Sequence, residues 1–564
     1  MNSLTRVFCR ALIATTAIVF TSFAANAQGP DAKTKATGSI SGRVTIGGKA
    51  AEGISVAAFG GENFDRRVAA AKAATDGDGR YHLSGLAPGQ YQIAPLTPNL
   101  TAAQQESFQS YGPSFFGASK NIILAANEMV DDIDVKLVRG GVITGRVTDA
   151  DNKPVVEVRV SLQPIADPQN PVRAPVPYNS QMYQTDDRGI YRIYGLPASR
   201  YTVSVGSGGA EGIVAPGSRR YYQRTFHPDV TEAAKATIIE LAEGGEATNI
   251  DIKLGSSADT YSVIGHVIDS ETGLSISGVR IGFLTVRPNQ DRSSTFYSGL
   301  TSDNRGEFKF DGFGPGHYGA YVSSENDGGE FYSNPTYFEI VDKDVAGVEL
   351  KAIRGLSLSG VVIVEGNMTK EMLAQVAGLR VSANVMPTSG AQINGSANSS
   401  VAPDGSFQIN GLRPGRVSIG IFTSGSSVKR PTIAHIEHDG LGVSQGFEIQ
   451  PGQSISGLRI VVNYGTGTIR GMVRFEGGSM PIDSRTFVSC RREGARDTAG
   501  GQVDSRGHFV ISNLAPGTYE VALQLISPRP QRPTPPQKQQ VTVTSDSESA
   551  VTFVINLAPK EGGP

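Results

Sequence analysis

Residues 76–91 read Asp-Gly-Asp-Gly-Arg-Tyr-His-Leu-Ser-Gly-Leu-Ala-Pro-Gly-Gln-Tyr, which is a turn, a strand, a second turn and the start of another strand. Similar phrases recur about 100 residues apart, the length of a small domain rather than of a solenoid repeat. The five copies span residues 76–91, 186–201, 303–318, 401–417 and 503–519. The chain is therefore predicted to be an array of similar domains.

Strands are also predicted on both sides of each phrase, from apolar residues at alternate positions. The opening strands carry a central glycine, which fits a bulge or a close approach of facing backbone; they are residues 40–44, 143–147, 263–267, 358–362 and 469–473. The closing strands are residues 133–137, 250–254, 348–350, 458–460 and 553–555. A further strand is expected at 156–160, and the two turns of each phrase are interpreted as β-hairpin turns.

About seven strands per copy predict an all-β fold, a tandem array of about five β-sandwiches. The composition agrees, with 68 Gly, 31 Pro and 18% charged residues among 564. The predicted segments are a signal peptide (1–27), a disordered segment (28–37), five sandwiches (38–138, 139–257, 258–354, 355–464 and 465–558) and a tail (559–564). The Pro-rich stretch 528–536 is interpreted as a loop inside the last sandwich.

The N-terminus has the order of a secretory signal peptide. Two arginines precede a short apolar run at residues 11–20, and Ala-Asn-Ala follows at 25–27. The run is too short to span a membrane, and no later segment reads as a membrane helix. We therefore expect cleavage after Ala27 and an exported mature chain without a membrane span, located in the periplasm, at the cell surface or outside the cell.

After that cleavage the chain keeps a single cysteine, Cys490. A lone thiol cannot form an internal disulfide, so the domains must depend on their hydrophobic cores. Cys490 itself is expected to be a small buried apolar residue.

The opening strand with its glycine, the Asp-x-x-Gly-x-Tyr/Phe turn and the Leu-x-Pro-Gly-x-Tyr turn together resemble the carboxypeptidase regulatory-like domain. The resemblance covers nearly all of residues 38–558 in five copies. It implies sandwiches of the transthyretin-like, immunoglobulin-like kind, grouped with carbohydrate-binding-like folds. In zinc carboxypeptidases this domain accompanies a catalytic domain with a His-x-x-Glu metal site, and no histidine of this chain begins that motif.

Chemistry-bearing motifs are weak. His435 and His438 form the only cluster with metal-ligand types, but in an extended chain they would point to opposite faces, which favours a solvated loop. The Asp-Gly-Asp-Gly at 76–79 starts like a calcium loop, yet position 87 is Ala where the loop needs Glu, so a turn is the better interpretation. We predict no catalytic residue, no metal and no cofactor, and a non-enzymatic protein. A formal net charge of −2 with scattered Lys and Arg argues against nucleic acid.

The strongest functional signal is an aromatic segment between the Pro-Gly turn and the closing strand in the first three copies. Exposed rings there would stack on sugars or hold a partner chain, whereas buried rings would plug their own sandwich or pack against a neighbouring one. The candidate ligand-binding residues are Tyr111, Phe115, Phe116, Tyr221, Tyr222, Phe226, Phe331, Tyr332 and Tyr337.

The leading functional hypothesis is an exported binding or spacer protein of the cell envelope, with polysaccharide or envelope glycan as ligand. The competing hypothesis is a structural scaffold or protein–protein interaction array, whose partner pairs with exposed edge strands. An accessory to a peptidase or another hydrolase is the third alternative. Exposed, clustered aromatics would favour glycan binding, and buried aromatics would favour the scaffold.

Overall fold

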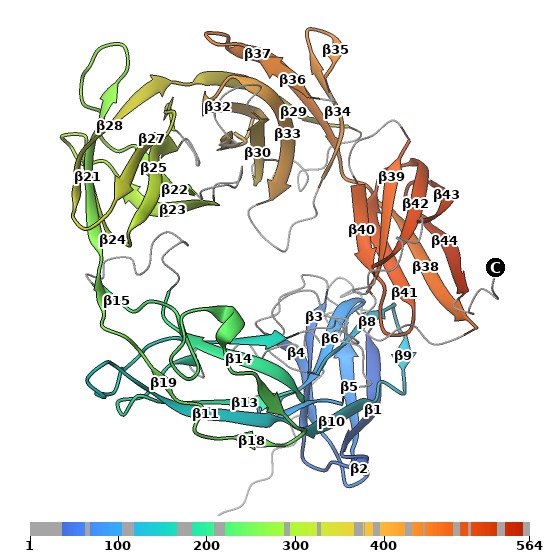
Figure 1. The fold of residues 1–564 in the computed structure, drawn as a ribbon. Helices are drawn as coiled ribbons and strands as arrows, with labels where there is room; N and C mark the ends of the chain where they lie inside the picture. Colours follow the sequence, from blue (N-terminus) through green and yellow to red (C-terminus); the bar gives the residue numbers. More distant parts are fainter. Residues whose placement is uncertain are drawn as a thin grey trace, which may run out of the picture. The chain divides into compact units, whose positions relative to one another are not determined.

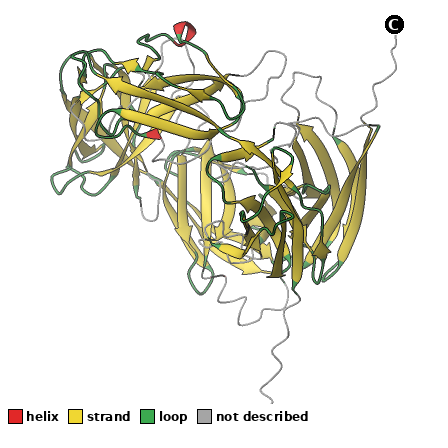
Figure 2. Cartoon of the chain, turned by 90° about the horizontal axis from the view of Figure 1, so that it is seen from below, coloured by secondary structure: helices red, strands yellow, loops and turns green. Residues whose placement is uncertain are grey.

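A computed structural model describes residues 37–61, 68–103, 118–165, 183–207, 220–286, 294–323, 329–365, 376, 378–386, 395–423, 431–443, 446–477, 485–493, 498–526 and 536–556. Strands make up the regular structure of these residues, with the 3-10 turn η2 (Ala233–Lys235) as a minor exception. Figure 1 labels the elements along the chain, and Figure 2 shows strands in yellow and only short helical turns in red. The predicted all-β fold is confirmed. The predicted signal peptide, the tail and the Pro-rich loop up to residue 535 lie outside the described residues.

The sheets of the described residues come in consecutive pairs, and each pair encloses a hydrophobic core with residues from both of its sheets. We call these pairs the first to fifth sandwiches in chain order. In every one, the first strand of the sandwich pairs in parallel with its closing strand and antiparallel with the strand that follows the first turn of the repeated phrase.

In the first sandwich, one sheet holds β1 (Gly38–Ile46), β2 (Lys49–Ala50), β5 (Arg80–Leu86), β7 (Leu100–Ala102), β9 (Met129–Val130) and β10 (Val135–Arg139). The other holds β4 (Ala69–Ala74), β3 (Ser55–Gly61), β6 (Gly89–Pro95) and β8 (Lys120–Leu124), in that order. Strand β8 is thus an edge strand.

The second sandwich contains β11 (Gly141–Thr148), β13 (Ile190–Leu196), β18 (Glu246–Ala247) and β19 (Ile252–Lys253), facing β12 (Val160–Ile165), β14 (Ser199–Val205), β16 (Thr225–Phe226) and β17 (Ile239–Leu241). A separate two-stranded sheet joins β15 (Arg220–Tyr221) to β20 (Ala258–Asp259), just before the third sandwich. The expected strand at 156–160 is wrong: β12 begins at Val160, because Glu157 has φ of 56°, which no strand accommodates.

The third sandwich contains β21 (Tyr261–Asp269), β24 (Glu307–Phe313), β26 (Phe331–Tyr332) and β28 (Val345–Arg354), facing β22 (Arg280–Val286), β23 (Ser294–Thr301), β25 (Gly316–Ser323) and β27 (Thr336–Ile340). The fourth contains β29 (Leu356–Val364), β32 (Ser406–Leu412), β34 (Thr432–His438), β35 (Leu441–Gly442) and β37 (Ile455–Asn463), facing β30 (Leu379–Met386), β31 (Gly395–Ser400), β33 (Gly415–Thr423) and β36 (Phe447–Ile449).

The fifth sandwich contains β38 (Gly467–Glu476), β41 (His508–Leu514) and β44 (Glu548–Asn556), facing β39 (Arg485–Arg492), β40 (Thr498–Gln502), β42 (Gly517–Ile526) and β43 (Gln537–Val543). Cys490 lies on β39 with 1% of its surface exposed, as expected for a small apolar core residue. Burial raises the pKa of its thiol to about 12.

The two turns of the repeated phrase are not β-hairpin turns, which corrects the expectation from the sequence. In the first sandwich β4 and β6 belong to one sheet, whereas β5 between them belongs to the other. Each turn therefore carries the chain across the core from sheet to sheet. The closing tyrosine fixes the second crossing: the Tyr91 hydroxyl donates to the carbonyl of Ala87 at 2.7 Å, and Tyr201, Tyr318 and Tyr519 repeat this bond four residues back.

The central glycine of each opening strand allows close backbone approach, one of the two alternatives expected for it. A Cβ on Gly42 would lie 2.2 Å from the carbonyl oxygen of Ile133, and a Cβ on Gly360 would lie 2.1 Å from that of Leu458. No larger residue fits there without moving the facing chain.

Candidate functional site

The first part of the site is the turn at residues 504–507, which precedes β41. Asp504 Oδ1 accepts hydrogen bonds from the backbone N–H groups of Arg506 (2.9 Å) and His508 (2.8 Å). The N–H of Gly507 donates to the Asp504 carbonyl at 3.0 Å and closes the turn. An aspartate is well suited to this position because its short side chain can bond its own backbone two residues on. These bonds use Oδ1, whereas Oδ2 accepts from Arg506 Nε at 3.3 Å and Nη2 at 3.2 Å and can also take a further partner.

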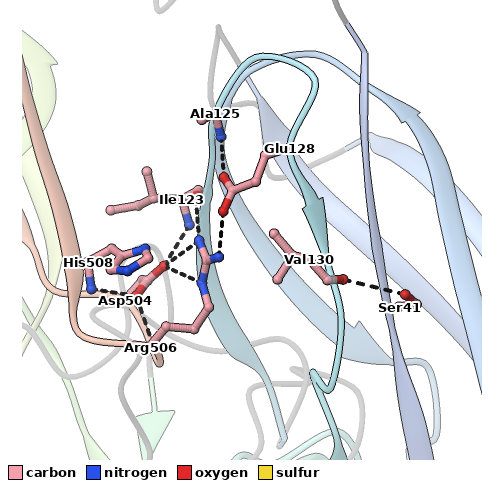
Figure 3. Close-up of polar contacts among 8 residues, drawn as sticks. All are labelled: Ser41, Ile123, Ala125, Glu128, Val130, Asp504, Arg506 and His508. Atoms are coloured by element: carbon pink, nitrogen blue, oxygen red, sulfur yellow. Dashed lines mark hydrogen bonds and ion pairs between the residues drawn. The ribbon is translucent and has the colours of Figure 1, made fainter.

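That partner is the edge strand β8 of the first sandwich (Figure 3). Asp504 Oδ2 accepts the N–H of Ile123 at 3.1 Å, and Arg506 Nη2 donates to the carbonyl of Ile123 at 2.6 Å. The N–H of Ser505 donates to the carbonyl of Asn121 at 3.0 Å. The turn therefore satisfies three successive outward-facing groups of an edge strand, the groups that an unprotected edge offers to other chains.

A carboxylate completes the contact. Arg506 Nη1 donates to Glu128 Oε1 at 2.7 Å, and Glu128 Oε2 accepts the N–H of Ala125 at 2.7 Å. In Figure 3 the Arg506 guanidinium lies between Glu128 on one side and Asp504 and Ile123 on the other. Burial opposes ionisation of Glu128, but the Ala125 N–H and the hydrogen bond and charge of Arg506 outweigh it, so the pKa of Glu128 is lowered.

The cluster is largely shielded from water, so its hydrogen bonds and ion pairs are weakly screened. The Asp504 side chain is 1% exposed, and those of Arg506 and Glu128 are 21% and 28% exposed. Removing either charged partner would leave the other partly buried without its counter-charge, a loss of about 1–3 kcal/mol for such groups. We call residues 504–506 together with 121–128 the turn–edge contact.

A second contact links the fourth sandwich to the third. Arg413 occupies the variable position of the Leu-x-Pro-Gly turn and is 6% exposed. Its guanidinium donates to the carbonyl of Ser333 and lies 4.9 Å from the centre of the Tyr332 ring. The N–H of Val322 donates to Ser333 Oγ at 2.8 Å, which holds Ser333 in place. A charged side chain thus joins two neighbouring sandwiches through a buried, hydrogen-bonded contact.

The aromatic candidates from the sequence do not form one cluster. Tyr111, Phe115 and Phe116 lie outside the described residues. Phe226 and Tyr332 are buried, at 7% and 9% exposure. Neither of these two rings faces solvent, so neither is available to stack on a ligand in this structure.

The remaining candidates are mostly packed within the protein. Tyr222 packs against the second core and Phe331 against the third, where Arg354 lies 5.1 Å from the Phe331 ring centre. Tyr221 is half-buried on β15, and burial, with a further contribution from nearby Tyr261, raises its pKa. Tyr337 differs, because it is 65% exposed.

His435 and His438 lie on strand β34, which corrects the loop expected from the sequence, and both are engaged in local bonds. His435 Nε2 lies 3.1 Å from Glu437 Oε1, and His438 Nε2 lies 3.1 Å from the carbonyl of Ser456. Within the described ranges, no three His, Cys, Asp or Glu side chains are grouped so that they could hold a metal ion. Nor does any helix in that part of the chain have the length and hydropathy needed to cross a membrane.

Sequence reasoning missed Arg506, Glu128 and Arg413. Two signals were present. Arginine recurs immediately before the turn glycine in the second, third and fifth copies, and Arg413 replaces the Ala, Pro or Gly found at the same point of the other Leu-x-Pro-Gly turns. Both are long cations placed at turns where the fold requires only a small residue.

Comparison with known proteins gives a family match within the second sandwich. The family model of the carboxypeptidase regulatory-like domain matches residues 142–254. This confirms the resemblance for the second copy. No curated protein matches the chain.

Solved structures that are similar to parts of this chain include several pilins. A streptococcal ancillary pilin is 13% identical, covering 56% of this chain and 99% of its own, with a TM-score of 0.25. The minor pilin of the Gram-positive pathogen Streptococcus agalactiae is 13% identical, covering 37% and 99%, with a TM-score of 0.19. The major pilin subunit of Bacillus cereus is 11% identical, covering 56% and 99%, with a TM-score of 0.14.

Proposed function

We propose that the mature chain is an exported, non-enzymatic scaffold of the cell envelope or cell surface, which holds β-sandwiches in fixed relation and presents their turns and edges to protein partners. The observation that carries this proposal is the turn–edge contact. A charged turn of the fifth sandwich satisfies the backbone of an edge strand in the first, through bonds that serve no fold-internal purpose in either sandwich.

The packing of the aromatic candidates also favours the scaffold over the glycan-binding alternative. Tyr332 contacts Arg413 of the next sandwich, and Tyr221 lies on a strand that pairs with residues preceding the third sandwich. These rings therefore contribute to contacts between sandwiches rather than to an exposed platform. Glycan recognition normally needs exposed aromatic faces, and among the described candidates Tyr337 best meets that requirement.

The scaffold proposal is tested by single-molecule fluorescence between dyes on the first and fifth sandwiches. Glu52→Cys and Gln540→Cys supply exposed attachment sites, and buried Cys490 does not compete for label. We expect one narrow transfer-efficiency population for the wild type and a broadened one for Arg506→Gln. Equal, broad distributions for both proteins would overturn the proposal.

The glycan alternative is tested by co-sedimentation with insoluble polysaccharides and peptidoglycan. We expect the chain to stay in the supernatant. Retention that Tyr337→Ala abolishes, while the melting temperature stays unchanged, would instead assign the function to glycan binding.

A further inference from the structure

The turn that makes the turn–edge contact has two counterparts in the chain. The sequence Asp-x-Arg-Gly occurs in the fifth copy at 504–507, in the second at 186–189 and in the third at 303–306. In the first and fourth copies an aspartate, Asp78 or Asp404, stands where the arginine would be. The chain therefore contains three turns with the same pair of charged side chains and two without it.

The three turns have the same internal geometry. Asp186 Oδ1 accepts from the N–H groups of Arg188 (3.0 Å) and Ile190 (2.7 Å). Asp303 Oδ1 accepts from those of Arg305 (2.9 Å) and Glu307 (2.8 Å). These bonds match the ones that Asp504 makes in the fifth sandwich. All three turns thus hold the second carboxylate oxygen and the arginine at the same point of the loop.

The three turns differ in what the arginine side chain contacts. The Arg506 side chain is 21% exposed because it contacts β8, whereas those of Arg188 and Arg305 are 73% and 74% exposed. Arg188 Nη2 lies 3.3 Å from Asp186 Oδ2, as Arg506 Nη2 lies 3.2 Å from Asp504 Oδ2, and Arg305 Nη2 lies 3.0 Å from Glu307 Oε2 at the start of β24. These two turns present to solvent the same groups that the fifth turn uses for binding.

The fifth turn shows what such a turn recognises. It binds the outward N–H and C=O groups of an edge strand, together with a carboxylate that follows the strand. Addition of a charged turn to a free edge is a form of edge-strand recognition, in which main-chain bonds supply affinity and the ion pair supplies specificity. The ligand class of the exposed turns is therefore an edge strand followed by a carboxylate.

We propose that the Asp-x-Arg-Gly turns of the second and third sandwiches are docking elements for β8 and Glu128 of a second copy of this chain. Within one chain, the fifth turn is tethered near β8 at high effective concentration and occupies it first. When that contact opens, β8 becomes available to Arg188 or Arg305 of another copy. The resulting association is heterologous, since a turn on one copy binds an edge on the next.

This inference rests on the scaffold function proposed above and adds its partner. It also explains why the fifth turn covers the edge strand β8 within a single chain. An edge strand left open is a template for uncontrolled pairing, and the fifth turn restricts pairing to partners that displace it.

The test is the mass of the Arg506→Glu variant of the full chain by sedimentation equilibrium over a wide range of concentration. This variant places a carboxylate against Glu128, so it releases β8 while keeping Arg188 and Arg305. We expect the wild type to stay monomeric and the variant to at least double its mean mass with rising concentration. Adding Arg188→Glu and Arg305→Glu to the variant is expected to restore the monomer.

A matched control reverses the same number of charges elsewhere. Arg80→Glu and Arg192→Glu change exposed arginines on the strands that follow the turns of the first and second copies. They should leave the association of the Arg506→Glu variant intact. Arg506→Gln serves in place of Arg506→Glu if circular dichroism shows that the charge reversal impairs folding. A monomeric variant at every concentration, or an association that survives loss of Arg188 and Arg305, would overturn the inference.

Failure of the inference is distinguishable from failure of the scaffold. If fluorescence shows that the variant is open and sedimentation shows that it stays monomeric, the docking role is wrong and the scaffold proposal is unaffected. A wild type without the turn–edge contact in solution removes the scaffold itself.

Discussion

Arg506 donates to Glu128 at 2.7 Å across 378 residues of sequence, and the same guanidinium bonds the carbonyl of Ile123. The contact joins a turn to an edge strand. The aspartate of the turn holds the turn's own backbone, and the edge strand has outward N–H and C=O groups that need hydrogen-bond partners. Each side is preorganised by its own sandwich: Asp504 by the turn, Glu128 by the N–H of Ala125. Preorganisation lowers the entropic cost of the contact, because few side-chain rotations remain to be lost.

Acidification should open the turn–edge contact. The pKa of Glu128 is lowered from 4.5 when the contact is made, so the contact gains stability from ionised Glu128 above about that pH. This stability is lost as the pH falls through the lowered pKa. Fluorescence transfer between the labelled first and fifth sandwiches should therefore fall below pH 4.5. The Glu128→Gln variant should lack this component, and an identical titration in both proteins would contradict the assignment.

Replacing Gly42 by Ala should destabilise the first sandwich by about 2 kcal/mol or more, because the new methyl would overlap the Ile133 carbonyl and the facing chain must move. Urea unfolding of the full chain, followed by a probe in that sandwich, measures the change. Gly77→Ala is the control, since nothing lies within 4 Å of a Cβ there. Equal effects of the two substitutions would show that the close approach is not limiting.

Arg413→Ala should weaken the junction of the third and fourth sandwiches by about 2 kcal/mol, through loss of the bond to Ser333 and of the contact with the Tyr332 ring. Hydrogen exchange of the amides around Ser333 reports the loss. Arg416→Ala, at an exposed position three residues later, is the matched control and should leave exchange near Ser333 unchanged. A junction indifferent to Arg413→Ala would mean that the cation contributes nothing.

Cys490 should resist thiol reagents at neutral pH in the folded protein. Burial excludes the reagent and raises the pKa of the thiol to about 12, which suppresses the reactive thiolate. Reaction with a chromogenic disulfide should occur only after unfolding in denaturant. Rapid modification of the native chain would show that β39 opens far more readily than its packing indicates.

The sandwiches were predictable because their determinants are local. Each copy contains the alternating strands, a central glycine such as Gly42 and the recurring turns. The five copies of one chain therefore repeat the same pattern. What the strand pattern did not reveal is which sheet each strand joins. The turns before Arg80 and Gly89 resemble hairpin turns in composition, yet both cross the core. At the second of them, the bond of Tyr91 to Ala87 favours a corner between sheets.

The site was less predictable because its partners are distant. Nothing near Arg506 in sequence points to Glu128, and the arginine has the same neighbours in type as Arg188 and Arg305. The aromatic segments drew attention by composition, but Tyr332 and Phe226 are large apolar groups, and packing against their own or a neighbouring sandwich buries them. A charge at a turn is informative only once the opposing surface is known.

The most direct test of the turn–edge contact is a double-mutant cycle of Glu128→Gln and Arg506→Gln, read as the fraction of closed molecules by fluorescence transfer between the first and fifth sandwiches. We predict a coupling free energy of about 1 kcal/mol, with the double variant no more open than Arg506→Gln alone. Coupling near zero, with strictly additive effects of the two substitutions, would contradict the account.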